Sequence, residues 1–234
     1  EMEMISHRIM RQTLSDEIYA QLKERIVSLQ LKPGEMIYES KVADAFGVSR
    51  TPVREAINRL EQEELINILP QRGACIAYLS EKKFREVQFI RETLEVASLR
   101  QIAAQWDQSD KLYQKAEEEL LAIIESQKEV ARKEQYVKYV ELDARFHARL
   151  LELADNQTLL QVLKVMRAHL NRMRYLELKE GRHEWQSIQQ HEEILKYIMA
   201  NDVENTEKSL IYHLRYIVND WDKITSKYAD YFAK

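Results

Sequence analysis

The chain has 234 residues, of which 45% are hydrophobic and 32% charged, and its formal net charge is −4. This is the composition of a soluble globular protein of one or two domains, and it excludes a disordered chain. No apolar run approaches the roughly 18 residues that a membrane span needs, and residues 1–12 show no signal-peptide pattern. A single cysteine, Cys75, excludes internal disulfides and multi-cysteine zinc sites. We therefore expect a cytoplasmic protein without a membrane partner.

Turn-forming residues are concentrated near the N-terminus. Three of the four glycines and all three prolines precede residue 74. This distribution predicts short elements in residues 1–79 and long helices in residues 80–234, which we interpret as two domains. Acidic residues slightly outnumber basic ones in both domains, by 12 to 10 in the first and by 27 to 25 in the second. Nucleic-acid binding must therefore depend on a local arrangement of charge.

The first domain contains a helix-turn-helix pattern. Apolar spacing predicts a helix from Leu14 to about Leu29, and a second, short helix over 39–46 that Gly47 ends. A third helix is expected to begin at Ser49 and to run to Leu60. Two short helices joined by a glycine turn are typical of DNA-binding proteins, in which the second helix of the pair enters the major groove.

The start of the third helix carries the residues expected to contact DNA. Ser49, Arg50, Thr51 and Arg54 lie there without an intervening acid. Arginine can bind guanine through two hydrogen bonds, and a threonine hydroxyl can bind phosphate.

The segments 65–69 and 74–78 predict a β-hairpin whose tip carries Arg72 and Gly73. Such a wing is placed to enter the adjacent minor groove. The alternative is a helical docking module with solvated arginines. The hairpin and the acid-free start of the third helix favour DNA binding.

Several motifs in this region resemble the GntR family of bacterial transcription regulators. They are Leu-Lys-Pro-Gly-Glu at 31–35, Val-Ser-Arg-Thr-Pro-Val-Arg-Glu-Ala at 48–56, Arg-Leu-Glu at 59–61, and Arg72-Gly73. The resemblance implies a winged helix that binds double-stranded operator DNA, a near-palindrome, as a homodimer. The family usually has glycine where Glu64 stands, and some members have arginine where Ser40 stands.

The second domain is expected to be an antiparallel bundle of about six helices, which makes the whole protein mainly α. The helices are predicted over residues 81–106, 109–129, 131–154, 156–180, 184–200 and 202–228.

Four residues with metal-binding side chains lie on apolar faces of this bundle. Asp143 and His147 are four residues apart on one helix, and His191 and His213 lie on two others. Burying these groups without partners is costly, so we interpret them as one shared metal site. For any one histidine alone, a hydrogen-bonded core residue is the better interpretation. We assign no role to the remaining histidines, which are His7, His169 and His183.

The same residues, with Ala-Asp-Asn at 154–156, resemble the ligand-binding FCD domain of the FadR-type branch of the GntR family. The resemblance implies a divalent metal held by Asp143, His147, His191 and His213, which helps to hold a small organic acid as effector. Nitrogen-rich ligation suits Zn, Ni, Fe or Mn. Arg91 matches a family arginine expected to bind the acid, and Arg172 is a second candidate.

The sequence thus predicts a DNA-binding transcription regulator, expected to act as a repressor, whose operator affinity is switched by a small organic acid at the metal site. Two alternatives stay open. A metal with open positions could activate water in an enzyme that acts on small carboxylates. The bundle could also be a metal-free dimerisation module with a structural polar cluster.

Overall fold

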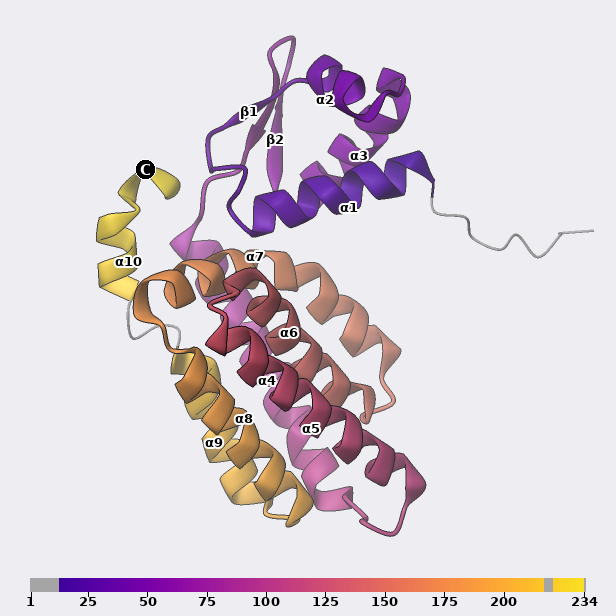
Figure 1. The fold of residues 1–234 in the computed structure, drawn as a ribbon, viewed down its shortest axis with the longest axis vertical. Helices are drawn as coiled ribbons and strands as arrows, with labels where there is room; N and C mark the ends of the chain where they lie inside the picture. Colours follow the sequence, from indigo (N-terminus) through magenta and orange to yellow (C-terminus); the bar gives the residue numbers. More distant parts are fainter. Residues whose placement is uncertain (1–12, 217–220, 234) are drawn as a thin grey trace, which may run out of the picture. The chain divides into compact units, whose positions relative to one another are not determined.

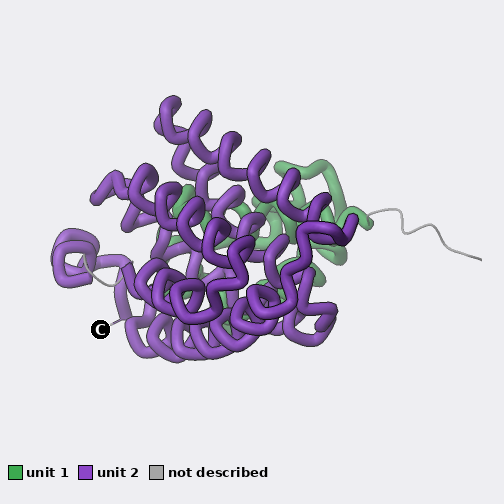
Figure 2. The backbone as a smooth tube through the Cα atoms, turned by 90° about the horizontal axis from the view of Figure 1, so that it is seen from below, with its two compact units in different colours: residues 1–78 green, residues 79–234 purple. Residues whose placement is uncertain are grey.

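The structure, a computed structural model, describes residues 13–216 and 221–233. His7 therefore lies outside the described residues. The chain divides into two compact units, with the boundary between Tyr78 and Leu79 (Figure 2). The two units are described separately below.

The first unit is a three-helix domain with a small antiparallel sheet. Its elements are α1 (Leu14–Val27), β1 (Met36–Ile37), α2 (Glu39–Phe46), α3 (Arg50–Gln62), β2 (Ile66–Leu69) and β3 (Gly73–Ile76). The strand order is β1-β3-β2. The helix-turn-helix and the hairpin are confirmed. Strand β1 was not predicted, because it is only two residues long and depends on the distant partner β3.

Left-handed backbone conformations mark the turns of this unit. Gly47 ends α2 with φ +65°, as a left-handed cap does. Glu64 has φ +57°, which explains why glycine is usual at this position. At Gly73, φ is +102° and an added Cβ would lie 2.8 Å from the Ile37 carbonyl oxygen. Only glycine fits this start of β3 without displacing β1.

Helices α1 and α3 pack together to form the core of the first unit. Their buried residues recur at helical spacing, and they are Ile18, Leu22 and Ile26 on α1 and Val53, Ala56, Ile57 and Leu60 on α3. Burying these side chains leaves the first turn of α3 free to face solvent.

The second unit is a helical bundle. Its elements are α4 (Glu81–Gln105), α5 (Lys111–Arg132), α6 (Tyr136–Glu152), α7 (Gln157–Gly181), α8 (Glu184–Met199), α9 (Val203–Tyr216), α10 (Trp221–Lys227) and a short 3₁₀ helix (Ala229–Tyr231). Helix α5 packs against α6 and α8, while α4 packs against α7 and α9 (Figure 1). The mainly α fold class is confirmed.

The predicted last helix, 202–228, is described as two separate helices, α9 and α10, and residues 217–220 between them lie outside the described residues. Trp221 stacks on Phe84 with ring centroids 5.0 Å apart and lies 6.0 Å from the Phe232 ring. Helix α10 therefore packs against the start of α4. It does not belong to the central core cluster that contains Leu210 and Leu214.

A backbone bridge ties the end of the chain to the start of the second unit. The Leu79 N–H donates to the Tyr231 carbonyl at 2.8 Å, and the Ala233 N–H donates to the Leu79 carbonyl at 2.9 Å. Within the described ranges, no helix is long and apolar enough to cross a membrane.

Candidate functional site

The predicted DNA-reading residues are exposed on the first unit. Ser49, Arg50, Thr51 and Arg54 lie at the N-terminal end of α3, and all four are exposed. Ser49 is the N-cap residue, but its hydroxyl makes no capping hydrogen bond within α3. Among the described elements this helix end therefore offers a hydroxyl and two arginines to solvent.

The predicted wing residues lie at the turn of the hairpin. Arg72 is exposed in the turn between β2 and β3, and its N–H donates to the Leu69 carbonyl at 2.9 Å. Gly73 begins β3 opposite Leu69. The turn thus presents the Arg72 side chain outward.

The four predicted metal ligands come together inside the second unit. Asp143 and His147 lie on α6, His191 on α8 and His213 on α9. All four are buried, and one ligand atom from each lies within 4.8 Å of the others. The Nε2 atom of His213 is 3.0 Å from that of His147 and 3.2 Å from that of His191.

Each of the three imidazoles is oriented by an oxygen on the opposite side of its ring. Nδ1 of His147 lies 2.8 Å from Glu95 Oε2. Nδ1 of His191 and of His213 are bonded to the side-chain oxygens of Gln127 and Gln190, at 3.0 and 2.8 Å respectively. In a neutral imidazole whose Nδ1–H donates, Nε2 carries the lone pair. The three lone pairs therefore face one another.

This arrangement fits a cation. Asp143 Oδ1 is buried and makes no hydrogen bond within the described part of the chain. Its ion-pair neighbours, Arg174 Nη2 and His191 Nε2, are both 3.5 Å away. Ligands bound about 2.0–2.1 Å from a metal lie about 3.0–3.4 Å from one another, which matches the Nε2 separations. Lone pairs and a carboxylate oxygen at such distances require a positive charge between them.

Burial and neighbouring charges set the ionisation of the cluster. Burial lowers the pKa of His191 to about 3 and also lowers the pKa of His213 well below its usual value. Burial alone would raise the pKa of Asp143, but Arg174 and the nearby imidazoles outweigh it, and the pKa is lowered. The site therefore holds an ionised carboxylate and neutral imidazoles, the forms that bind metals.

These shifts predict acid sensitivity of the metal-free protein. Below the unfolded-state pKa of about 6.5, the unfolded chain binds a proton at His191 that the folded protein rejects down to about pH 3. The free energy of unfolding should therefore fall on acidification, approaching about 1.4 kcal/mol per pH unit for each such histidine. Urea denaturation in EDTA at pH 7, 6 and 5 measures this. Between pH 7 and 5 a flat stability profile would contradict it, because the lowered pKa of Asp143 acts only at lower pH.

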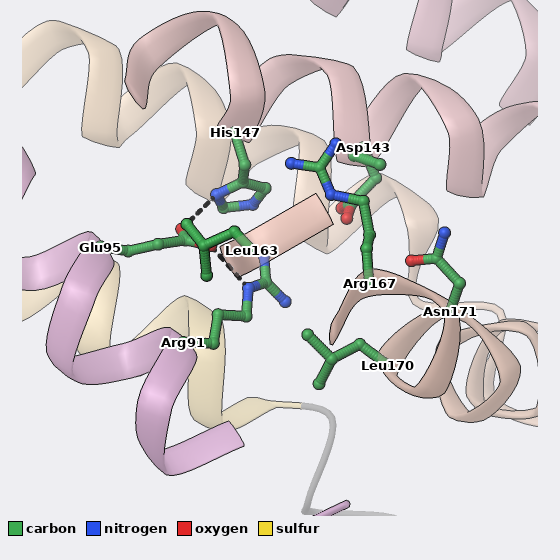
Figure 3. A pocket seen from close by; sticks show the side chains of 9 residues that line it. Arg91, Glu95, Asp143, His147, Leu163, Arg167, Leu170 and Asn171 are labelled. Atoms are coloured by element: carbon green, nitrogen blue, oxygen red, sulfur yellow. Dashed lines mark hydrogen bonds and ion pairs between the residues drawn. The ribbon is translucent and has the colours of Figure 1, made fainter. Parts of the chain in front are cut away.

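A pocket lies beside the metal cluster. It holds about 320 Å³ of space not filled by atoms, part of it open to solvent. Its lining residues are Arg91, Glu95, Asp143, Ala144, His147, Leu163, Arg167, Leu170 and Asn171. Figure 3 shows Arg91 and His147 both bonded to Glu95, and the guanidinium of Arg167 near Asp143. The pocket thus combines metal ligands with two arginines.

The two predicted effector-binding arginines have different positions. Arg91 lines the pocket and donates from Nε to Glu95 at 2.7 Å. Arg172 is 1% exposed and is not among the lining residues, and burial lowers its pKa to about 10. Arg167 lies in the pocket instead. Arg167 and Asn171 share one helix face at i, i+4 spacing, and the next residue, Arg172, is turned by about 100°.

Sequence analysis missed the groups that support the cluster. Glu95, Gln127 and Gln190 orient the three imidazoles. Arg174 is bonded to Glu177 and to Ser187 Oγ, at 2.7 and 2.6 Å, beside Asp143. One signal was available: Glu95 lies four residues after Arg91, on the same helix face.

Comparison with known proteins assigns both units. Residues 14–76 match the model of the bacterial regulatory proteins of the gntR family, and residues 86–216 match the FCD domain. The chain belongs to the GntR family. It has the FadR-type architecture of a GntR helix-turn-helix and an FCD domain. Members of these families are transcription regulators and not enzymes, so the chain is a DNA-binding transcription regulator.

Relatives resemble the chain over nearly its full length. The HTH-type transcriptional repressor RspR of Escherichia coli K12 is 29% identical over 225 residues, which is 95% of each chain. A regulator from Streptomyces ambofaciens is 29% identical over 223 residues, covering 93% of this chain and 89% of the relative. The gluconate operon transcriptional repressor of Bacillus subtilis is 41% identical over 75 residues, 32% of this chain and 30% of the relative.

Solved structures share the fold. Escherichia coli McbR/YncC has a TM-score of 0.76 at 17% identity and covers 92% of this chain and 99% of its own. A putative GntR regulator from Rhodococcus sp. RHA1 has a TM-score of 0.73 at 18% identity, with 91% and 97% covered. At these identities, the likeness shows the fold alone.

Proposed function

We propose that the protein is a homodimeric repressor that reads a near-palindromic operator and is switched by a small organic acid. The reading residues are Ser49, Arg50, Thr51, Arg54, Arg72 and Gly73. Their exposure at one end of α3 and at the hairpin turn supports this role. In a dimer, two such surfaces would read two half-sites about one helical turn apart.

The second unit supplies the sensor. Asp143, His147, His191 and His213 hold a divalent transition metal, with Zn, Ni, Fe and Mn as candidates. The observation that carries this proposal is the set of imidazole lone pairs that converge 3.0 and 3.2 Å apart beside the unbonded oxygen of Asp143. The metal supplies a Lewis-acid centre for an acid's carboxylate.

Charge in the pocket explains why the acid would need the metal. Without a metal, the two positive charges of Arg91 and Arg167 are matched by the negative charges of Glu95 and Asp143. A divalent cation leaves the lining with an excess of two positive charges. That excess favours a di- or tricarboxylate over a neutral molecule, and Asn171 adds an amide for hydrogen bonding.

The acid acts as a switch only if it binds the DNA-free and DNA-bound arrangements with different affinity. Couplings of this kind are typically about 1–3 kcal/mol. We propose that the acid releases the protein from its operator. The relatives named as repressors, RspR and the gluconate operon repressor, support repression as the mode of action.

Selection of genomic DNA fragments by the purified full-length protein, followed by sequencing, tests this function. We expect enrichment of a near-palindrome with two half-sites. Metal analysis of the same preparation separates the sensor from a metal-free interaction bundle, since the sensor should contain about one divalent ion per chain. A protein that enriches no sequence, with or without added zinc, would contradict the regulator proposal.

A further inference from the structure

The exposed Arg54 of the DNA-reading helix is held by a carboxylate from the neighbouring helix. Arg54 Nε donates to Glu39 Oε1 at 3.3 Å, and Arg54 Nη2 donates to Glu39 Oε2 at 3.0 Å. The Arg54 side chain is 63% exposed, whereas that of Glu39 is 31% exposed. Among the reading residues of α3, Arg54 thus has a second helix to fix its direction.

Glu39 is itself well placed to hold this arginine. It is the first residue of α2, and the positive end of a helix dipole favours a carboxylate at that position. Helix α2 also packs against α3, which fixes the distance between the two side chains. An exposed ion pair of this kind contributes little to folding stability. Its position on the reading surface therefore calls for another explanation.

The grip leaves the donors needed for DNA recognition free. A guanidinium has five N–H groups, one on Nε and two on each Nη. Glu39 takes one from Nε and one from Nη2. The end of the fork, formed by Nη1 and the second N–H of Nη2, can still donate to O6 and N7 of a guanine. A side chain held in this way also loses less rotamer freedom when it binds.

We propose that Glu39 is a positioning residue that holds Arg54 for end-on recognition of an operator guanine. The inference rests on the proposed role of Arg54 in DNA reading. It differs from a purely electrostatic effect. A carboxylate that only repels phosphate would weaken binding to all DNA alike. A carboxylate that orients Arg54 strengthens the preference for one base.

The experiment compares Glu39→Ala with the wild-type full-length protein. The control is Asp44→Ala, which removes the same charge from the same exposed side of the chain without a bond to Arg54. Affinities are measured at one salt concentration for the selected operator, for operators in which each half-site guanine is replaced by adenine, and for an unrelated duplex. Circular dichroism melts check that each variant folds.

We expect Glu39→Ala to reduce discrimination at one guanine about tenfold, equivalent to 1.4 kcal/mol. Its affinity for the unrelated duplex should stay equal or rise, because a negative charge is lost. Asp44→Ala should leave discrimination unchanged. Glu39→Gln, which keeps one acceptor oxygen, should fall between wild type and Glu39→Ala.

Equal tightening on every duplex, with discrimination unchanged, would overturn the proposal in favour of phosphate repulsion. A double-mutant cycle separates this failure from a failure of the reading assignment. If Arg54→Ala also retains discrimination, the assignment of Arg54 itself is wrong. If Arg54→Ala loses discrimination and Glu39→Ala does not, only the positioning role is wrong. The proposal requires that Glu39→Ala has no further effect in the Arg54→Ala background.

Discussion

Replacing Arg54 with alanine is expected to reduce operator affinity to near the level of unrelated DNA. A bidentate contact of arginine with guanine gives about 1–3 kcal/mol of discrimination, and a dimer loses it at both half-sites. The fall should therefore be about 30-fold or more, and up to roughly 10⁴-fold. Fluorescence anisotropy with the selected operator measures the change.

The matched control for this variant is Arg25→Ala, which removes an exposed arginine from the last turn of α1 in the same unit. It should retain the operator preference. Both variants should keep the wild-type metal content, since neither residue belongs to the second unit. Full sequence preference in Arg54→Ala would show that α3 does not read the operator through this side chain.

Replacing His191 with alanine is expected to cause the second large effect, a loss of bound metal. His191 is fully buried, and its Nε2 lies 3.2 Å from that of His213 and 3.5 Å from Asp143 Oδ1. Losing even a partner of a ligand typically weakens metal binding about 10–100-fold, so losing a ligand should weaken it further. Elemental analysis after dialysis, and competition with a chelating dye, measure the loss.

His169→Ala provides the control, because His169 is on α7 and is not part of the four-residue cluster. It should bind metal as the wild type does. Thermal melts in EDTA show whether His191→Ala still folds. An unchanged metal content in a folded His191→Ala protein would mean that the cluster is not the metal site.

Local signals in the sequence predicted most of the first unit. Gly47 and the N-cap Ser49 define the turn of the helix-turn-helix, because their conformational preferences act within a few residues. Strand β1 was missed because its partner residues, Ala74 and Cys75, are nearly 40 positions away. A two-residue strand has no periodicity of its own.

The metal ligands were predictable because polar residues on apolar helix faces need a reason to be buried. Their supporting residues were not. Gln127 and Glu95 contact the imidazoles of His191 and His147 from other helices, 64 and 52 positions away. Two ordinary polar residues at such separations have no local pattern, so only packing brings them to the site.

The choice between arginines on α7 also needed the structure. Arg167 and Arg172 are both flanked by apolar residues, and only the rotation of α7 decides which one faces the pocket. The predicted last helix failed for a similar reason. The spacing of Leu214 and Trp221 continues a helical pattern, but Trp221 packs on Phe84 and not in the central core.

The most direct test of the sensor proposal is the effect of acids on operator binding by the zinc-loaded protein. A panel of mono-, di- and tricarboxylates is titrated against the preformed complex of protein and operator, with wild type and His191→Ala in parallel. We predict that at least one acid weakens wild-type operator binding by about 5–150-fold, the range of typical allosteric couplings. His191→Ala should not respond to that acid. An equal response of His191→Ala and wild type would contradict the account, because the switch would then act without the metal site.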